Sequence, residues 1–335
     1  MSDFLETRSS LGELIEGVGV QFQKVFNETD DAYISPLGEM LVSAGVKSSS
    51  IFKVDTVTGS IVHYTGKTGV ALTQLTGEGA DMFIDQRYFG YRTDVAPQKF
   101  TSGIAVTMEA RDDLDRQYKS ELDEFKDLIM AAHQKEAKSP FDLLNYGFTA
   151  QASLPAELYP YGDGKPLFST AHPRLDGGTA QANTFSSAVT QLPLSDTAIE
   201  LARVNILSQL SDRGLPLRTT NQVCLLVPSA LEKLAQIITN STKRSGTMNN
   251  DVNIYDGSVT VMSSKWFNAN STTAWYVVDA GLSQLRFLRR APVSTFPVMQ
   301  SNLTQIFYVW HRFACAFTQW VGTFGSKGDS SAYSG

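Results

Sequence analysis

The sequence is poor in the residue types on which many enzymes and nucleic-acid-binding proteins depend. Among 335 residues there are only 2 cysteines and 4 histidines, and charged residues make up 19%. Lys and Arg number 28 against 34 Asp and Glu, for a net charge of −6. An acidic chain lacks the basic surface with which proteins wrap or read nucleic acid. Cys224 and Cys315 lie far apart in apolar runs, so we expect buried, reduced thiols.

Long hydrophobic runs are also missing. No stretch approaches the ~20 apolar residues that cross a bilayer. Residues 1–6 carry acids where a secretory signal carries bases, so we expect synthesis in the cytosol. The length permits one large domain or two to three smaller ones with substantial cores.

Residues 9–26 have an apolar stripe at helical spacing. Gly12, Gly17 and Gly19 weaken this helix by roughly 1 kcal/mol each. The segment is therefore either an arm that docks on another surface or an ordinary amphipathic helix on its own domain.

The signal changes to strand between residues 50 and 108. Two runs, 70–75 and 82–89, flank Gly77, Glu78 and Gly79, and glycine supplies the positive φ that a tight turn needs. We expect a long hairpin with its tip near Glu78. Three further glycines let it bend: Gly66, Gly69 and Gly90. Because a two-stranded ribbon is marginally stable alone, this one needs a neighbour to lie on.

The clearest helix spans residues 112–138, with Asp112 and Asp113 at its start and Ser139-Pro140 as its predicted end. Its length predicts a rod of ~35–40 Å.

A proline-rich, loop-like stretch over residues 150–193 indicates a domain junction. A small α/β unit follows, with a helix capped by Ser195, a buried strand at 223–227 and a helix from Pro228. Further strands are predicted at 259–262, 274–278, 285–288, 305–310 and 314–317. A Gly- and Ser-rich tail begins at Gly325.

The residues that could carry chemistry do not form a convincing site. His172 lies in a proline-rich loop, where a histidine is more often a structural hydrogen-bonding residue. Residues 162–165 contain two glycines and a lysine without the Walker spacing, so we interpret them as a turn. The histidines and cysteines lack the spacing of zinc ligands. We therefore predict no catalytic residue, no metal site and no cofactor.

Several segments carry a resemblance to a known family, and their order and spacing over residues 160–328 are fairly specific. They are 166–173 with Asn183, 194–216, 225–232, 249–253, 274–279 and 324–328. The chain resembles the major capsid proteins of tailed phages with the Hong Kong 97-like fold, and is most similar to the phage Mu-type major head subunit. Over residues 1–110 only the architecture agrees.

The resemblance implies an α+β Hong Kong 97-like capsid fold. Its parts would be an N-terminal arm at 1–60, an E-loop hairpin at 61–100, a peripheral domain at 101–189 with a spine helix at 112–138, an axial domain at 190–283, and peripheral return strands with a C-terminal tail at 284–335. The expected assembly contacts are Gly77, Glu78, Gly79, Phe83, Tyr88, Lys243 and Arg244. An arm, a hairpin and a rod bury surface between subunits better than within one.

The implied function is a self-assembling shell subunit without catalysis. Pentamers and hexamers would form an icosahedral shell around double-stranded DNA, with no sequence-specific binding and no membrane. The expected partners are a portal, a separate scaffolding protein and decoration proteins. The chain would reside in the virion capsid, and in the host cytoplasm during assembly. The hairpin tip has no lysine, the nearest being Lys67 and Lys99, so we expect no covalent cross-link there.

Two alternatives stay open. One is an encapsulin-like compartment with the same fold and a protein cargo. The other is an α/β enzyme in which His172 pairs with an acid such as Asp163.

Overall fold

The computed structural model describes residues 51–69, 72–79, 81–85, 89–107, 118–186, 190–217, 223–241, 253, 259–268, 271–301 and 304–333. The predicted N-terminal helix at 9–26, and Asp112 and Asp113, lie outside these residues. The chain divides into two compact units. The first takes its described residues from Gln98–Ala137 and Arg289–Phe313, and the second from the part up to Pro97, Lys138–Leu288 and Ala314–Gly335. No helix in the described ranges is both long and apolar enough to cross a membrane.

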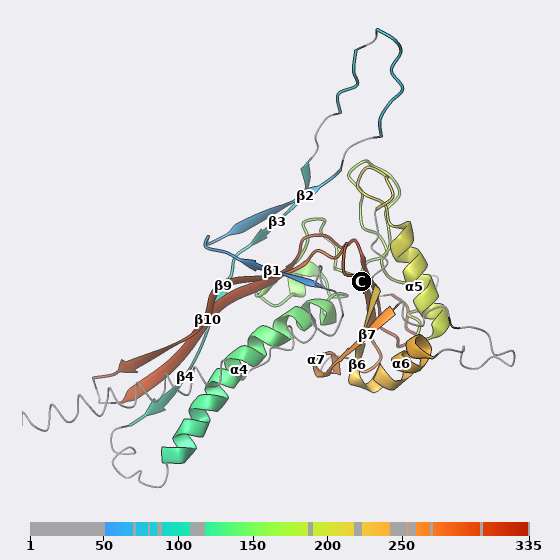
Figure 1. The fold of residues 1–335 in the computed structure, drawn as a ribbon. Helices are drawn as coiled ribbons and strands as arrows, with labels where there is room; N and C mark the ends of the chain where they lie inside the picture. The colour runs from blue at the N-terminus through green and yellow to red at the C-terminus, as the bar shows by residue number, and fades with distance from the viewer. Residues whose placement is uncertain are drawn as a thin grey trace, which may run out of the picture. The chain divides into compact units, whose positions relative to one another are not determined.

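In the first unit a long helix covers one face of an antiparallel sheet (Figure 1). Strand β4 (Gln98–Val106) pairs with β10 (Gln305–Phe317), and β10 also neighbours β9 (Leu285–Met299). Because strand side chains alternate between faces, Phe307 and Val309 both point to helix α4 (Tyr118–Asn145). The rings of Phe307 and Phe125 lie 4.6 Å apart.

Helix α4 continues past Ser139-Pro140 to Asn145. The predicted end of the helix at Ser139-Pro140 is therefore wrong. Proline inside a helix costs about 3 kcal/mol. Phe141 and Leu144 lie beyond it and are buried. Burial of two such side chains gains about 3–6 kcal/mol, so packing outweighs the proline.

Strands β9 and β10 are both longer than predicted. The runs 305–310 and 314–317 form one strand, because the polar residues between them have partners. His311 Nδ1 lies 3.3 Å from Oε1 of Glu136 on α4, and Arg289 donates to Oε2 of the same carboxylate at 2.7 Å.

The second unit is built on a four-stranded sheet in the order β11-β8-β6-β7. Its strands are β6 (Val223–Pro228), β7 (Val259–Ser264), β8 (Trp275–Asp279) and β11 (Thr323–Ser326). Helices α5 (Asp196–Ser208) and α6 (Glu232–Asn240) pack into the same apolar core as alternate residues of β6 and β8. The predicted cap is confirmed, since Ser195 accepts a hydrogen bond from the Ala198 N–H. The buried strand at 223–227 is confirmed as well.

Strand β11 falls where the sequence predicts the start of a tail. Gly325 lies so close to Phe168 that a Cβ would come within 2.8 Å of the ring. Ser326 donates to the Leu192 carbonyl at 2.8 Å. Close packing thus requires small residues in β11. In the sequence alone, the same glycine and serine residues are typical of an unstructured tail.

The predicted hairpin exists, but its paired strands differ from those expected. Strands β2 (Val62–Lys67) and β3 (Phe89–Val95) form the antiparallel stem, with a register shift between Thr65 and Lys67. Of the predicted runs 70–75 and 82–89, the described residues 72–75 and 82–85 are not in strands, whereas Phe89 is the first residue of β3. Gly66 and Gly90 meet at the shift, where a Cβ on Gly90 would come within 2.6 Å of the Gly66 carbonyl oxygen.

The remaining elements are short: β1 (Phe52–Thr56), η1 (Gln151–Ser153), β5 (Leu158–Tyr159), η2 (Ser229–Leu231) and α7 (Lys265–Asn268). Both cysteines are free and buried, as predicted. Burial raises the pKa of the Cys224 thiol to about 11.

Candidate functional site

The hairpin loop, defined here as residues 72–85, presents apolar side chains to solvent. Met82 and Ile84 are 88% and 86% exposed, and Leu72 and Leu75 are also exposed. Large apolar side chains gathered in this way usually mark an interaction surface, because leaving them in water is unfavourable. The loop is thus a candidate contact surface of the second unit.

The predicted tip residues are at the end of this loop. Glu78 and Gly79 form the turn, and Gly79 has a φ of +79°, which glycine adopts without strain. Gly77 and Phe83 flank it, and Phe83 is 47% exposed. The other expected contact residues, Tyr88, Lys243 and Arg244, lie outside the described residues.

The loop is also acidic. It contains Glu78, Asp81 and Asp85 and no lysine or arginine. Asp85 pairs with Arg213, whose Nη1 lies 2.9 Å from Oδ1. The ion pair holds one limb of the loop to residues 211–215, which lie far from it in the sequence.

Helices α5 and α6 each expose a second apolar stripe, opposite the one packed on the sheet. On α5 it is Leu201, Val204 and Leu207, and on α6 it is Leu234 and Ile237. Each of these side chains is 41–52% exposed. An amphipathic helix needs only one apolar face to pack on its own sheet, so these stripes are further candidate contact surfaces.

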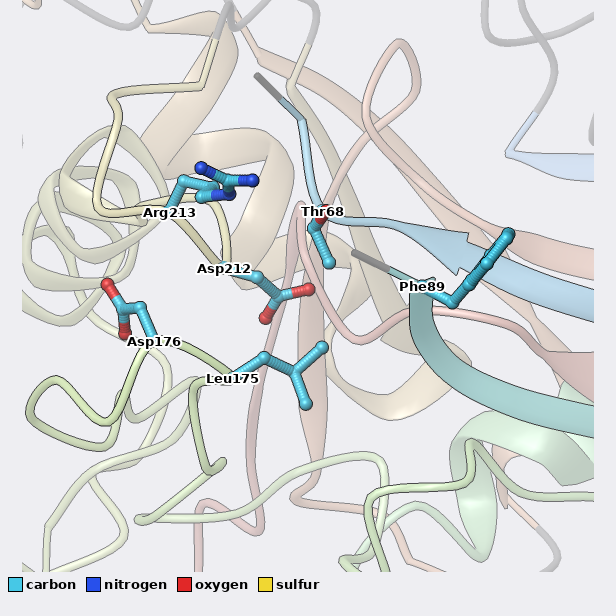
Figure 2. Close-up of a pocket in the computed structure, with 6 residues that line it drawn as sticks. All are labelled: Thr68, Phe89, Leu175, Asp176, Asp212 and Arg213. Carbon is cyan, nitrogen blue, oxygen red and sulfur yellow. The ribbon is translucent and has the colours of Figure 1, made fainter. Parts of the chain in front are cut away.

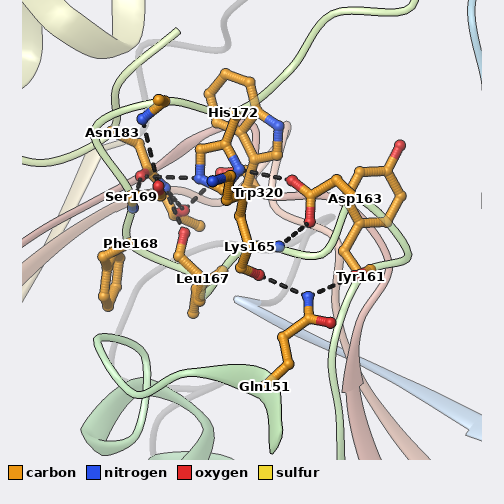
Figure 3. A network of polar contacts seen from close by, with 12 residues as sticks. Gln151, Tyr161, Asp163, Lys165, Leu167, Phe168, Ser169, His172, Asn183 and Trp320 are labelled. Carbon is orange, nitrogen blue, oxygen red and sulfur yellow. Dashed lines mark hydrogen bonds and ion pairs between the residues drawn. The ribbon is translucent and has the colours of Figure 1, made fainter. Parts of the chain in front are cut away.

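His172 is at the centre of a buried polar network (Figure 3). Its Nδ1 lies 2.7 Å from Oδ2 of Asp163 and its Nε2 lies 3.2 Å from Oδ1 of Asn183. The ring stacks on Trp320 with centroids 4.4 Å apart.

The orientation of the Asn183 amide follows from its other partners. Its Nδ2 donates to the Leu167 carbonyl, and its Oδ1 accepts from the Ser169 N–H. His172 Nε2 therefore donates to Asn183, and Nδ1 lies against the Asp163 carboxylate. Both ring nitrogens are occupied.

This geometry confirms the pairing of His172 with Asp163 but does not suit catalysis. Both side chains have no solvent exposure, so a substrate cannot reach them. A general base must come within hydrogen-bond reach of the proton it abstracts. Residues 162–165 form a turn, as predicted, in which the Lys165 N–H donates to Asp163. Within the described ranges, His, Cys, Asp and Glu nowhere gather into a group of three that could hold a metal.

Comparison with known proteins identifies the family. The family model described as "Phage capsid protein" matches residues 90–324, more than half of the chain. The chain belongs to this family. The match covers residues of both units and of the stem strand β3. It makes the protein a structural component of a phage capsid shell, and it favours neither an encapsulin-like compartment nor an enzyme.

Several solved capsid structures are similar to this chain in fold. The capsid of a native GTA particle has 9% sequence identity and a TM-score of 0.52, covering 84% of this chain and 89% of that one. The capsid of an empty GTA particle has 9% identity and a TM-score of 0.50, covering 82% and 87%. A capsid of the Helicobacter pylori bacteriophage KHP30 has 10% identity and a TM-score of 0.49, covering 90% of both chains. The likeness to the GTA capsids shows a shared fold. No curated protein sequence matches the chain.

Proposed function

We propose that this capsid protein assembles into pentamers and hexamers of an icosahedral shell that encloses double-stranded DNA. The observation that carries the proposal is the exposed apolar hairpin loop. Burial of Leu72, Leu75, Met82 and Ile84 against another copy would supply about 1.5–3 kcal/mol for each side chain. A contact of this kind repeats around a closed ring when the subunits pack head to tail.

We further propose the Hong Kong 97-like fold, of the Mu type, for the whole chain. Residues 1–60 would be the arm, 61–100 the E-loop, 101–189 and 284–335 the peripheral domain and 190–283 the axial domain. The order of stem, long helix α4 and compact sheet unit supports this division. In it, the apolar stripes of α5 and α6 would meet neighbouring axial domains, and Lys243 and Arg244 would lie near the symmetry axes.

The proposal includes several partners. A portal, a separate scaffolding protein and decoration proteins would act with the shell, which would be built in the host cytoplasm. The net charge of −6 favours a shell that encloses its genome without binding the DNA tightly. The burial of His172 and Asp163 supports a role without catalysis.

The hairpin loop provides the direct test. A variant with Leu75→Ser, Met82→Ser and Ile84→Ser should fold as a subunit and fail to form stable shells, because these side chains are exposed within one subunit. A matched control in the same loop is Thr73→Ser, Gln74→Ser and Thr76→Ser. Sedimentation and electron microscopy should find shells for the control only, and shells of normal yield from the apolar variant would contradict the proposal.

A further inference from the structure

A pocket of about 460 Å³ lies in the second unit, beside the end of the stem from which the hairpin loop extends (Figure 2). Its lining consists of Thr68, Phe89, Leu175, Asp176, Asp212 and Arg213. The pocket is distinct from the His172 network and from the exposed hairpin loop. Its wall combines carboxylates with apolar side chains.

Two arginines beside this pocket pair with carboxylates, but a third carboxylate has no ion-pair partner among the described residues. Arg174 pairs with Asp176, and Arg213 pairs with Asp85. Asp212 is left over, and its Oδ2 is buried without a hydrogen-bond partner. A buried polar atom without a partner is costly, and more so if it is charged.

Arg174 is held where it is by close backbone packing. A Cβ on Gly178 would come within 2.8 Å of the Arg174 guanidinium carbon, and one on Gly214 within 2.6 Å of its Nη2. Gly214 also has a positive φ of +75°, so the turn is built around a residue without a side chain. The enclosed guanidinium pairs with Asp176, and its charge also acts on Asp212, but Oδ2 of Asp212 receives no hydrogen bond.

The surroundings of Asp212 favour an incoming positive charge. Burial raises the pKa of Asp212, and the neighbouring charges of Asp176 and Asp163 raise it further against the opposing effect of Arg174. A cation placed beside the carboxylate would reverse this penalty.

Two of the other lining residues, Phe89 and Leu175, are apolar and can contact an aliphatic chain. Leu175 is 41% exposed and Phe89 is 82% exposed, although both line the pocket. Long cationic side chains and alkylamines bury their methylene groups on such surfaces while their charged ends find a partner.

We propose that this pocket binds an ammonium or guanidinium group carried on an aliphatic chain, with Asp212 as its counter-ion and Phe89 and Leu175 along the methylene groups. The group has two possible sources, a Lys or Arg side chain of a neighbouring subunit or a free alkylamine. The first source rests on the proposed assembly function, and the second does not.

The unassembled subunit tests the site itself. Saturation-transfer NMR at low salt should detect binding of n-pentylammonium and much weaker binding of methylammonium, because the short ion lacks the methylene groups. The uncharged 1-pentanol should not compete. This comparison uses the natural sequence only, so it does not depend on the folding of a variant. Equal binding of the two ammonium ions, or none of either, would overturn the proposal.

Substitution then identifies the counter-ion. Asp212→Asn should weaken n-pentylammonium binding at least about tenfold, as expected for loss of a charged hydrogen-bond partner. Glu124→Gln removes an equal charge from an exposed position on α4 and should leave binding unchanged. Equal loss in both variants would indicate non-specific charge attraction and overturn the proposal.

Assembled shells distinguish the two sources. If a neighbour's side chain occupies the pocket, shells should no longer bind n-pentylammonium while free subunits do. If the natural occupant is a free amine, shells and subunits should bind alike. Both results support the pocket chemistry, and a subunit that binds but forms no shell would contradict only the proposed assembly function.

Discussion

Nδ1 of His172 lies 2.7 Å from Oδ2 of Asp163, and neither side chain has any exposure to solvent. The pair joins the turn at residues 162–165 to the loop that contains His172, and Asn183 extends the connection. We expect a structural role, because a buried, hydrogen-bonded pair of this kind fixes one arrangement of the segments that supply its partners.

His172→Ala should destabilise the subunit by about 3–5 kcal/mol, because it leaves the buried Asp163 without its partner. The midpoint of urea unfolding should therefore fall markedly. Lys165→Ala is a control in the same turn, since the Lys165 side chain is exposed and only its backbone N–H binds Asp163. An unchanged midpoint for His172→Ala would contradict the structural role.

Glu136 makes the stability of the first unit dependent on pH. Burial raises its pKa, but the hydrogen bond from His311 and the charge of Arg289 outweigh burial and lower it overall. A carboxyl with a lowered folded-state pKa adds stability above its unfolded pKa and loses it as pH falls through the folded value.

Glu136→Gln should therefore cost about 1–3 kcal/mol at pH 7. The difference from the natural sequence should shrink as the pH is lowered past the folded-state pKa of Glu136. Urea titrations at pH 7 and at pH 3 measure both values. A difference that stays constant between the two would show that Glu136 does not act through its charge.

Alanine substitutions at Gly162 and Gly164, two glycines of one turn, should destabilise the subunit to different extents. A Cβ on Gly162 would come within 2.2 Å of the Arg92 carbonyl oxygen on β3, whereas Gly164 has a φ of +75° and open space around it. Gly164→Ala should lower the free energy of unfolding by roughly 1–2 kcal/mol, the cost of a left-handed conformation for alanine. Gly162→Ala should lower it by well over that amount, because the new methyl group overlaps the backbone of β3. Thermal unfolding of both variants makes the comparison, and equal losses would show that the turn does not press against β3.

Asp212→Asn should raise the melting temperature of the unassembled subunit at pH 7. The raised pKa of Asp212 means that its ionised form opposes folding at any pH above that value, and the amide has no such penalty. The gain should vanish at a pH low enough to protonate the carboxyl in both states. A lower melting temperature at pH 7 would indicate a cationic partner within the subunit itself.

Local sequence signals predict several elements of the second unit. Ser195 before an amphipathic run gives the start of α5, and the apolar run at 223–227 gives a strand buried on both faces. In both cases the residues that specify the element are its own neighbours in sequence.

Long-range packing explains the failures. The helix passes Pro140 because Phe141 and Leu144 are buried, and β11 uses Gly325 because Phe168 leaves no room for a side chain. The sequence suggests the pairing of His172 with Asp163 only as part of the enzyme alternative. The complete burial of both side chains depends on the packing around them and cannot be read from the sequence. The pocket beside Asp212 combines residues from the stem and two distant loops, and no local pattern connects them.

The most direct test of the proposed function is electron microscopy of the purified protein, alone and with the products of its neighbouring genes. Closed, uniform polyhedral shells are the predicted result. A persistent monomer or small oligomer under both conditions would contradict the proposal that this capsid protein builds its shell through contacts between copies of itself.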